Sequence, residues 1–302
     1  MPLNLPPQRR SVAVLAATAL LALSACAPQA APEADPHTAP ASGLPSSHVH
    51  GLSVDPETGQ VLLASHDGLF DVTGSPATKI GETNDLMGFT AADQDVFYAS
   101  GHPGPGSDLP NPMGLIRSTD GGETWEQLSR QGQSDFHALA ATKSGIVAYD
   151  GTLQTSPDGK KWFVATAGFV PAVLAGSPET DTVLATTPEG VHRSDDGGKT
   201  WALNTTAPVI QFAAFASATD VFGVEPDGSV HYSADAGSTW TRAGRIEGEV
   251  QAVAAAAAAE GAEGAEGPEA EAAAGKPRLW AATTDSLVVS TDGGDTFRPA
   301  DS

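Results

Sequence analysis

An eight-residue pattern, S-x-D-x-G-x-T-W, recurs along the 302-residue chain. With one preceding residue it reads RSTDGGETW, RSDDGGKTW, YSADAGSTW and, with Phe replacing Trp, VSTDGGDTF. A degenerate copy, TSPDGKKW, is one residue short. The successive serines are 38, 38, 39 and 57 residues apart. A nearly fixed period of this length is typical of folds that repeat one supersecondary unit around a common core.

The residue types of the pattern favour a tight β-turn that leads into an outer strand. The Asp carboxylate can accept backbone N–H bonds inside the turn. The glycine permits a positive φ, and the aromatic residue can pack between neighbouring sheets. We therefore expect structural rather than catalytic roles for these positions: Ser118, Asp120, Gly122, Trp125, Asp158, Trp162, Ser194, Asp196, Gly198, Trp201, Ser233, Asp235, Gly237, Trp240, Ser290, Asp292, Gly294 and Phe297.

Each repeat contains enough residues for four short strands. In the third unit these read FHALAAT, GIVAYD, TLQTS and KWFVAT. A unit upstream lacks the pattern, but its HDGLFDV around Gly68 matches MGLIRS around Gly114. The chain thus predicts an all-β fold, a six-bladed β-propeller with four antiparallel strands per blade and each blade complete in sequence. The six units span 47–81, 84–129, 135–167, 169–205, 209–244 and 249–300.

The repeated pattern is the Asp-box (BNR) signature, and residues 47–302 resemble the Asp-box β-propellers. That group includes sialidases, sortilin-type receptors and bacterial lipoproteins labelled glycosylhydrolase by homology. The resemblance is informative about architecture and says little about activity. By analogy with known propellers, strands A to D of a blade run outward from the axis. The D–A connections and B–C loops then share one face, here called the top face, while the A–B loops and Asp-box turns share the other.

The N-terminal segment predicts export and lipid anchoring. Residues 1–26 combine Arg9 and Arg10 with a short apolar run, as in a signal peptide. The run ends in LSAC, which resembles the bacterial lipoprotein box, with Cys26 as the lipidated residue; a plain secretory signal is the alternative. Residues 27–46 contain six Ala and five Pro, which favour an extended tether. We expect the protein to lie outside the bacterial cytoplasmic membrane, anchored to its outer face.

Charge and cysteine content exclude several classes of function. The chain has 15 basic and 37 acidic side chains, a net charge of −22. A polyanion of this size repels nucleic acid and anionic headgroups, so membrane contact through the anchor alone is expected. Because Cys26 is the only cysteine, disulfides and thiolate metal sites in the mature protein are excluded. The acidic, alanine-rich stretch 254–277 is a low-complexity insert in the last blade, on the face opposite the top face.

Five of the eight histidines map to the top face of the first three blades, together with two carboxylates. His48 and His50 open the inner strand of the first blade, and alternation puts them on one face of that strand. In the aligned inner strands, His50 shares its position with Met87, His137, Ala172, Ala213 and Gln251. The predicted pocket at the channel mouth comprises His48, His50, His66, His102, His137, Asp85 and Asp135.

Three readings of this cluster remain open. Imidazole and carboxylate without thiolate suit a metal such as Zn or Cu. The histidines could instead bond to each other as channel lining, or serve as acids and bases. His192 and His231 lie in the middle of third strands and are expected to be structural.

The favoured function is a binding module that takes a small ligand, metal, glycan or protein at the top face. One alternative is a glycoside hydrolase that uses Asp85 and Asp135 as its carboxylate pair. A true sialidase is disfavoured, because the first blade has no arginine, and Arg130, Arg242 and Arg245, placed in D–A connections, come from scattered blades. The other alternative is a non-catalytic scaffold for protein partners.

Overall fold

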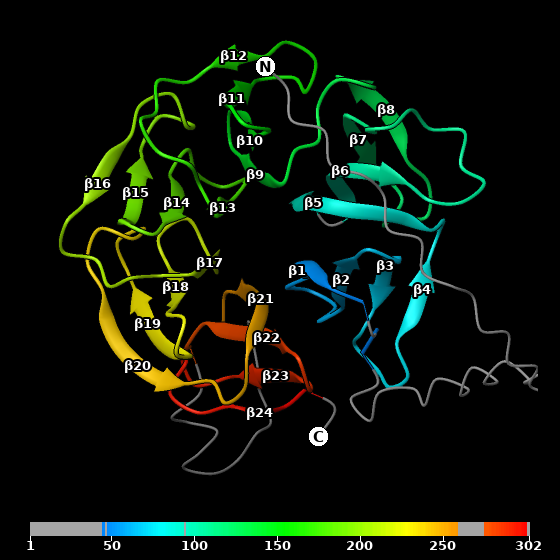
Figure 1. Ribbon diagram of the computed structural model, residues 1–302. Coiled ribbons are helices and arrows are strands. Elements are labelled where there is room, and N and C mark those ends of the chain that lie inside the picture. Colours follow the sequence, from blue (N-terminus) through cyan, green and yellow to red (C-terminus); the bar gives the residue numbers. More distant parts are fainter. Residues whose placement is uncertain (1–43, 46, 94, 259–274, 301–302) are drawn as a thin grey trace, which may run out of the picture. The chain divides into compact units, whose positions relative to one another are not determined.

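The computed structural model describes residues 44–45, 47–93, 95–258 and 275–300, and it confirms the propeller (Figure 1). The described residues form six four-stranded antiparallel sheets, each built from consecutive strands, and contain no helix. The described residues therefore include no helix that is long and apolar enough to cross a membrane.

The strands of the first three blades are β1 (Val49–Val54), β2 (Val61–Ser65), β3 (Gly68–Asp71), β4 (Thr78–Ile80), β5 (Asn84–Asp93), β6 (Val96–Pro103), β7 (Leu115–Ser118), β8 (Glu126–Ser129), β9 (Ala138–Thr142), β10 (Gly145–Tyr149), β11 (Leu153–Ser156) and β12 (Phe163–Val164). Those of the last three are β13 (Val173–Ala175), β14 (Val183–Thr187), β15 (Gly190–Ser194), β16 (Ala202–Asn204), β17 (Phe212–Phe215), β18 (Val221–Val224), β19 (Ser229–Ser233), β20 (Thr241–Arg245), β21 (Val250–Ala256), β22 (Arg278–Thr283), β23 (Leu287–Ser290) and β24 (Arg298–Pro299).

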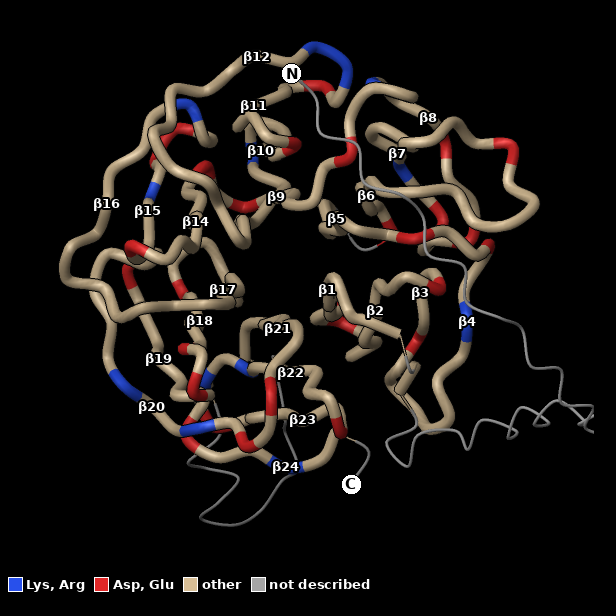
Figure 2. Tube along the Cα trace, in the orientation of Figure 1, with Lys and Arg blue, Asp and Glu red and all other residues tan. Residues whose placement is uncertain are grey.

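The first strand of each blade lines the axis, and the ring closes on itself. Each of β1, β5, β9, β13 and β17 contacts the first strand of the next blade, and β21 contacts β1. No strand is exchanged between the first and last blades among the described residues, because every sheet holds four consecutive strands. Figure 2 shows acidic positions recurring around this ring.

The hydrophobic core lies between blades. One cluster joins Leu62 and Leu69 of the first blade to Phe97 and Ile116 of the second. The cluster that closes the ring joins Leu63 to Trp280 in the last blade. Leu44, which the sequence analysis assigned to the tether, belongs to this same cluster and is buried. Cys26 and the rest of the predicted signal and tether lie outside the described residues.

Each complete Asp box is a hydrogen-bonded turn, as the sequence predicts. In the second blade the Ser118 hydroxyl accepts from the Gly122 amide at 2.8 Å and donates to Asp120 at 2.8 Å. The other oxygen of Asp120 accepts from the Thr124 hydroxyl at 2.6 Å, and Oδ1 also accepts from the Thr124 amide. The same bonds recur around Asp196, Asp235 and Asp292. In each of these turns the Ser and Asp side chains bond within the turn, which supports a structural role.

The box glycine brings each turn against the preceding blade. At Gly122 φ is +93°, and a Cβ there would lie 2.2 Å from Cδ2 of Leu69. At Gly237 a Cβ would lie 2.7 Å from Cδ1 of Leu184. A Cβ at either position would force the neighbouring leucine side chain to move. The glycine therefore permits close packing between blades as well as the positive φ of its backbone.

The insert begins later than the sequence indicated. β21 continues through Ala256, which pairs with Arg278 at the start of β22. Ala254 and Ala256 are buried, because the alternating alanines of this strand face the neighbouring blades. Residues 254–256 are thus part of the blade, and positions 259–274 lie outside the described residues.

We predict that Asp235→Ala lowers the free energy of unfolding by about 1–2 kcal/mol at pH 7, because it removes three side-chain hydrogen bonds of an exposed turn. The Thr239 hydroxyl bond holds the pKa of Asp235 at about 2. The wild-type advantage is therefore complete above about pH 5 and declines as the pH falls through about 4 to 2. Thermal melts across this range test it, with exposed Glu247→Ala as control; an advantage independent of pH would contradict it.

We also predict that joining Ala258 to Gly275 through a short Gly-Ser turn leaves the fold intact. The flanking strands already pair at Ala256 and Arg278, and each halving of a connection recovers about 0.6 kcal/mol of closure entropy. The melting temperature should be unchanged or slightly higher. A large decrease would show that the removed segment packs on the propeller.

Candidate functional site

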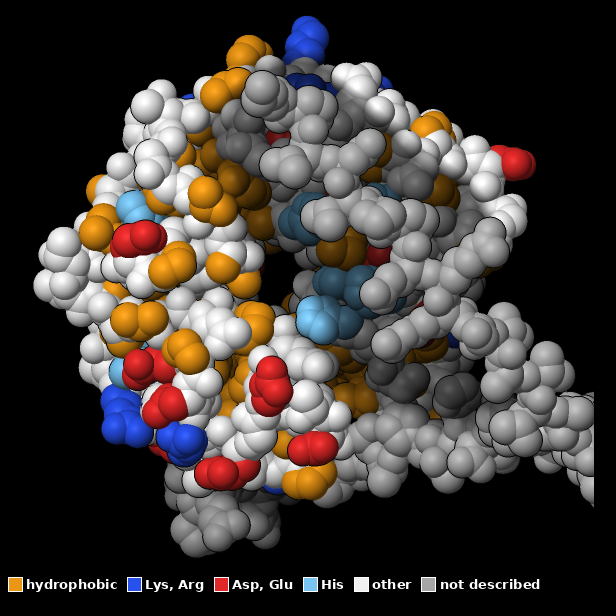
Figure 3. Space-filling view, in the orientation of Figure 1, with side chains coloured by type: hydrophobic (Ala, Val, Ile, Leu, Met, Phe, Trp, Pro, Cys, Tyr) orange, Lys and Arg blue, Asp and Glu red, His pale blue; other side chains and the backbone are white. Residues whose placement is uncertain are grey.

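The first strands of the six blades enclose a central channel of about 720 Å³. Five of the six positions aligned from the sequence line it: His50, His137, Ala172, Ala213 and Gln251. Figure 3 shows the channel open at the centre of the ring, with histidine side chains gathered on one side. The lining is therefore lopsided, as predicted, with imidazoles facing small side chains across the opening.

A β-bulge presents His50 to the channel. The pairing of β1 with β2 matches Val49 to Ser65 and then Gly51 to Ala64, which leaves His50 as an extra, unpaired residue. Gln251 is the corresponding extra residue in β21. Such bulges change the direction of a side chain without ending a strand. His48 lies one residue before β1 and His50 lies in the bulge, so neither occupies a regular position of the strand.

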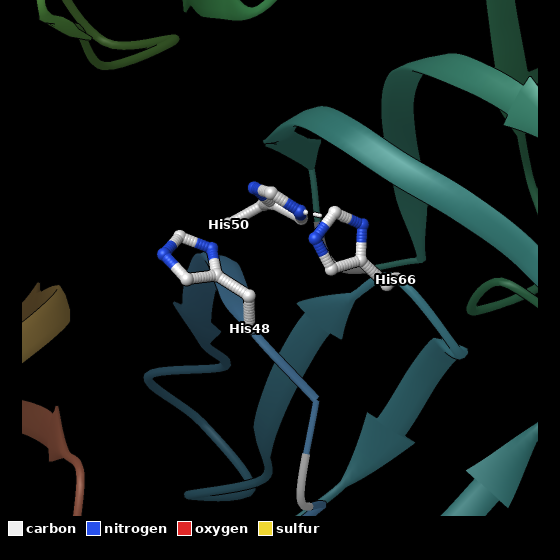
Figure 4. Close-up of side chains that lie close together, drawn as sticks. All are labelled: His48, His50 and His66. Atoms are coloured by element: carbon white, nitrogen blue, oxygen red, sulfur yellow. Dashed lines mark hydrogen bonds between the residues drawn. The ribbon is translucent and has the colours of Figure 1, made fainter. Parts of the chain in front are cut away.

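His48, His50 and His66 nevertheless come together (Figure 4). Each offers a ring nitrogen within 4.8 Å of the others. The ring centroids of His50 and His66 are 4.4 Å apart, and those of His48 and His50 are 5.0 Å apart. His66 reaches the group from the turn between β2 and β3, as predicted.

Asp85 completes this first group of side chains. Its Oδ1 lies 2.9 Å from Nδ1 of His66 and 3.7 Å from Nε2 of His50. The two nitrogens are themselves 3.3 Å apart. These three atoms form a compact triangle of possible ligand atoms at the channel mouth. We call His48, His50, His66 and Asp85 the first subsite.

Burial keeps His50 neutral. Its side chain is only 10% exposed, and this desolvation, helped by His66, lowers the pKa of His50 to about 4. Asp85 acts in the opposite direction but does not offset the burial. At neutral pH His50 therefore keeps a free ring-nitrogen lone pair, which is what a metal ligand or a base requires.

His102, His137 and Asp135 form a second subsite beside the first. Oδ2 of Asp135 lies 3.2 Å from Nε2 of His102 and 3.4 Å from Nε2 of His137. His102 is the cross-strand partner of Asp85, which places the two subsites side by side. The β6 backbone approaches closely here: a Cβ at Gly101 would lie 2.0 Å from the carbonyl oxygen of Asp85.

Asn111 is a site residue that the sequence did not identify. Its Oδ1 accepts a 2.7 Å hydrogen bond from Nδ1 of His102. This bond is the main reason that the pKa of His102 is raised, with Asp135 and Asp85 acting in the same direction against burial. Asn111 lies in the Gly/Pro-rich loop after β6, and its only signal in the sequence was that this loop could overhang the pocket.

The remaining predicted polar residues lie elsewhere. His192 stacks on Phe169 with ring centroids 3.8 Å apart, and His231 pairs with Glu225 at 2.6 Å. Both contacts fit the structural roles expected for these histidines.

Arg242 and Arg245 belong to β20, not to a connection as predicted. They contact Ser229 and Asp227, respectively. Arg130 donates to Gln154 at 2.8 Å. No arginine forms part of either subsite in the described contacts.

The repeat and the fold both match known proteins. The BNR/Asp-box repeat matches residues 116–127 and 192–203. The chain is thus a six-bladed β-propeller in which two of the turns match the Asp-box repeat. No curated protein matches the sequence.

Among solved structures, the GH74 xyloglucanase from Xanthomonas campestris is 16% identical with a TM-score of 0.55, over 84% of this chain and 39% of its own. The extracellular domain of the one-component system BT4673 from B. thetaiotaomicron is 12% identical with a TM-score of 0.51, over 84% of this chain and 33% of its own. This chain thus spans less than half the length of either protein, and identities this low establish the fold alone.

We predict that Asn111→Leu lowers the pKa of His102, because the hydrogen bond that most favours the protonated ring is lost. Histidine NMR titration measures this directly. Asp108→Asn, an exposed change in the same loop, is the control and should have a smaller effect. An unchanged His102 pKa in Asn111→Leu would show that the amide does not hold this ring.

Proposed function

We propose that this protein is an extracytoplasmic, lipid-anchored propeller that binds a divalent transition-metal ion at the mouth of its channel. The observation that carries the proposal is the triangle formed by Nε2 of His50, Nδ1 of His66 and Oδ1 of Asp85. Its edges are 2.9, 3.3 and 3.7 Å. Tetrahedral zinc, with bonds of about 2.0–2.2 Å, needs ligand atoms about 3.4 Å apart. The triangle therefore matches three ligands of such an ion with little rearrangement.

The ligand types narrow the choice of ion. His48 adds a third imidazole within 4.8 Å of the other two. Three imidazoles and one carboxylate suit Zn or Cu, whereas Mg and Ca prefer all-oxygen sites. His50 is neutral at physiological pH, since its pKa is about 4, so no proton competes for this ligand. The net charge of −22 also favours the accumulation of cations near the protein.

The proposed location rests on the N-terminal sequence. The apolar run ending in LSAC supports export and lipidation at Cys26. One structural neighbour, BT4673, is also described as an extracellular domain. Export would place the metal site where exogenous metal ions are accessible.

The two alternative functions receive less support from the geometry. A glycoside hydrolase would need Asp85 and Asp135 free to flank a glycosidic bond. Asp85 lies 2.9 Å from His66 and Asp135 lies 3.2 Å from His102, so each carboxylate already holds an imidazole. A pure scaffold would not need a group of three histidines with converging nitrogens. Both alternatives remain outcomes of the experiment.

Metal binding is tested by equilibrium dialysis against Zn or Cu, followed by elemental analysis. All samples carry Cys26→Ser, so that neither lipid nor thiol contributes. We expect the otherwise wild-type protein to retain the ion, and His50→Ala/His66→Ala to bind this ion more than about a hundredfold more weakly, because even outer-shell partners contribute roughly 10–100-fold. His192→Ala/His231→Ala removes two histidines elsewhere and should change nothing.

Two results would contradict the proposal. In one, the wild-type protein retains no metal. In the other, the control pair weakens binding as much as the site pair, which would indicate non-specific binding to surface histidines. Release of chromophore from aryl glycosides, lost in Asp85→Asn, would instead support the hydrolase.

A further inference from the structure

We infer that the channel mouth holds two metal ions, the second bound by His102, His137 and Asp135. This inference rests on the proposed metal-binding function. The described polar contacts divide the predicted site residues into two groups. His48, His50, His66 and Asp85 contact one another, whereas His102 and His137 both contact Asp135.

The hydrogen bonds at the far side of each ring determine where its lone pair lies. Nδ1 of His102 is 2.7 Å from the amide oxygen of Asn111, and Nδ1 of His137 is 3.2 Å from the backbone oxygen of Asp135. Both partners are oxygens that accept hydrogen bonds, so the tautomer with the proton on Nδ1 satisfies both contacts. In the neutral rings, both Nε2 atoms then present lone pairs.

These two lone pairs face the same negatively charged oxygen. Nε2 of His102 and Nε2 of His137 lie 3.2 and 3.4 Å from Oδ2 of Asp135. Lone pairs directed at a carboxylate repel it unless something positive lies between them. Either each ring takes up a second proton, or one cation serves all three atoms. Both distances are close to the separation of about 3.4 Å between ligands of a tetrahedral ion.

The surroundings favour a cation. Histidine ligands of metals usually donate their other N–H to a carbonyl or carboxylate, which fixes the tautomer and orients the ring; His102 and His137 both do so. Oδ1 of Asp135 is buried and has no hydrogen-bond partner, a condition that a nearby ion relieves. His102 and His137 remain about half exposed, so the proposed ion is accessible from solvent.

The two subsites predict a stoichiometry that distinguishes them. In Zn titrations of the Cys26→Ser protein, we expect two equivalents for the otherwise wild-type chain. Asp135→Asn/His137→Ala should bind one, at the first subsite. His50→Ala/His66→Ala should also bind one, at the second. Asn111→Ala should weaken only the second ion, by roughly 10–100-fold, because it removes an outer-shell partner.

Two further measurements test the second ion without relying on the number of bound equivalents. Histidine NMR should show Zn-induced shifts at Nε2 of His102 and His137 that persist in His50→Ala/His66→Ala. Thermal melts establish that each variant is folded, and His102→Gln replaces Asp135→Asn/His137→Ala if that variant is not.

Each other outcome is decisive. One equivalent that is lost in His50→Ala/His66→Ala but retained in Asp135→Asn/His137→Ala would overturn the second ion and leave the proposed function standing, with protons on His102 and His137. One equivalent lost in both variants would indicate a single shared site and overturn this inference. No bound Zn in any sample would overturn both proposals.

Discussion

Contact between the glycine of each complete Asp box and the preceding blade is the constraint on which the ring depends. The carboxylate and serine bonds fold the turn, and the missing Cβ lets it rest on the neighbouring core, as Gly122 does on Leu69. The box glycine thus serves both the conformation of the turn and the packing between blades. The first blade lacks a box, and its junction with the last blade instead relies on side chains such as Leu63, Trp280 and Leu44.

The sequence was sufficient to predict the propeller because the repeat sets both the period and the turn. Serines about 38 residues apart, each followed by Asp and Gly, permit few alternatives. The grouping of five histidines on one face also followed from the alignment of the blades. What could not be predicted depends on local backbone geometry. The bulge at His50 breaks the alternation of β1, and Asn111 reaches His102 only through the path of its loop. Ala254, Ala256 and Leu44 were assigned to the insert or the tether, but they are buried. Their alanine-rich or proline-rich surroundings resemble a linker in sequence, so their burial could not be predicted.

The chemistry of the mouth is concentrated on half of its circumference. Blades one to three contribute imidazoles and carboxylates, while Ala172 and Ala213 line the opposite wall. This arrangement leaves the bound ions, under the proposed function, with protein on one side and open channel on the other. Any further ligand would therefore meet the ions from the channel or from the top face.

The bulges in the inner strands separate the site from the scaffold. His50 and Gln251 occupy equivalent extra positions outside the ladder of backbone pairs, yet both line the channel. A side chain at such a position can be exchanged without disturbing a pairing partner or the register of its strand. A propeller with such bulges can therefore change the side chain that it presents to a ligand while the pairing of its strands stays the same.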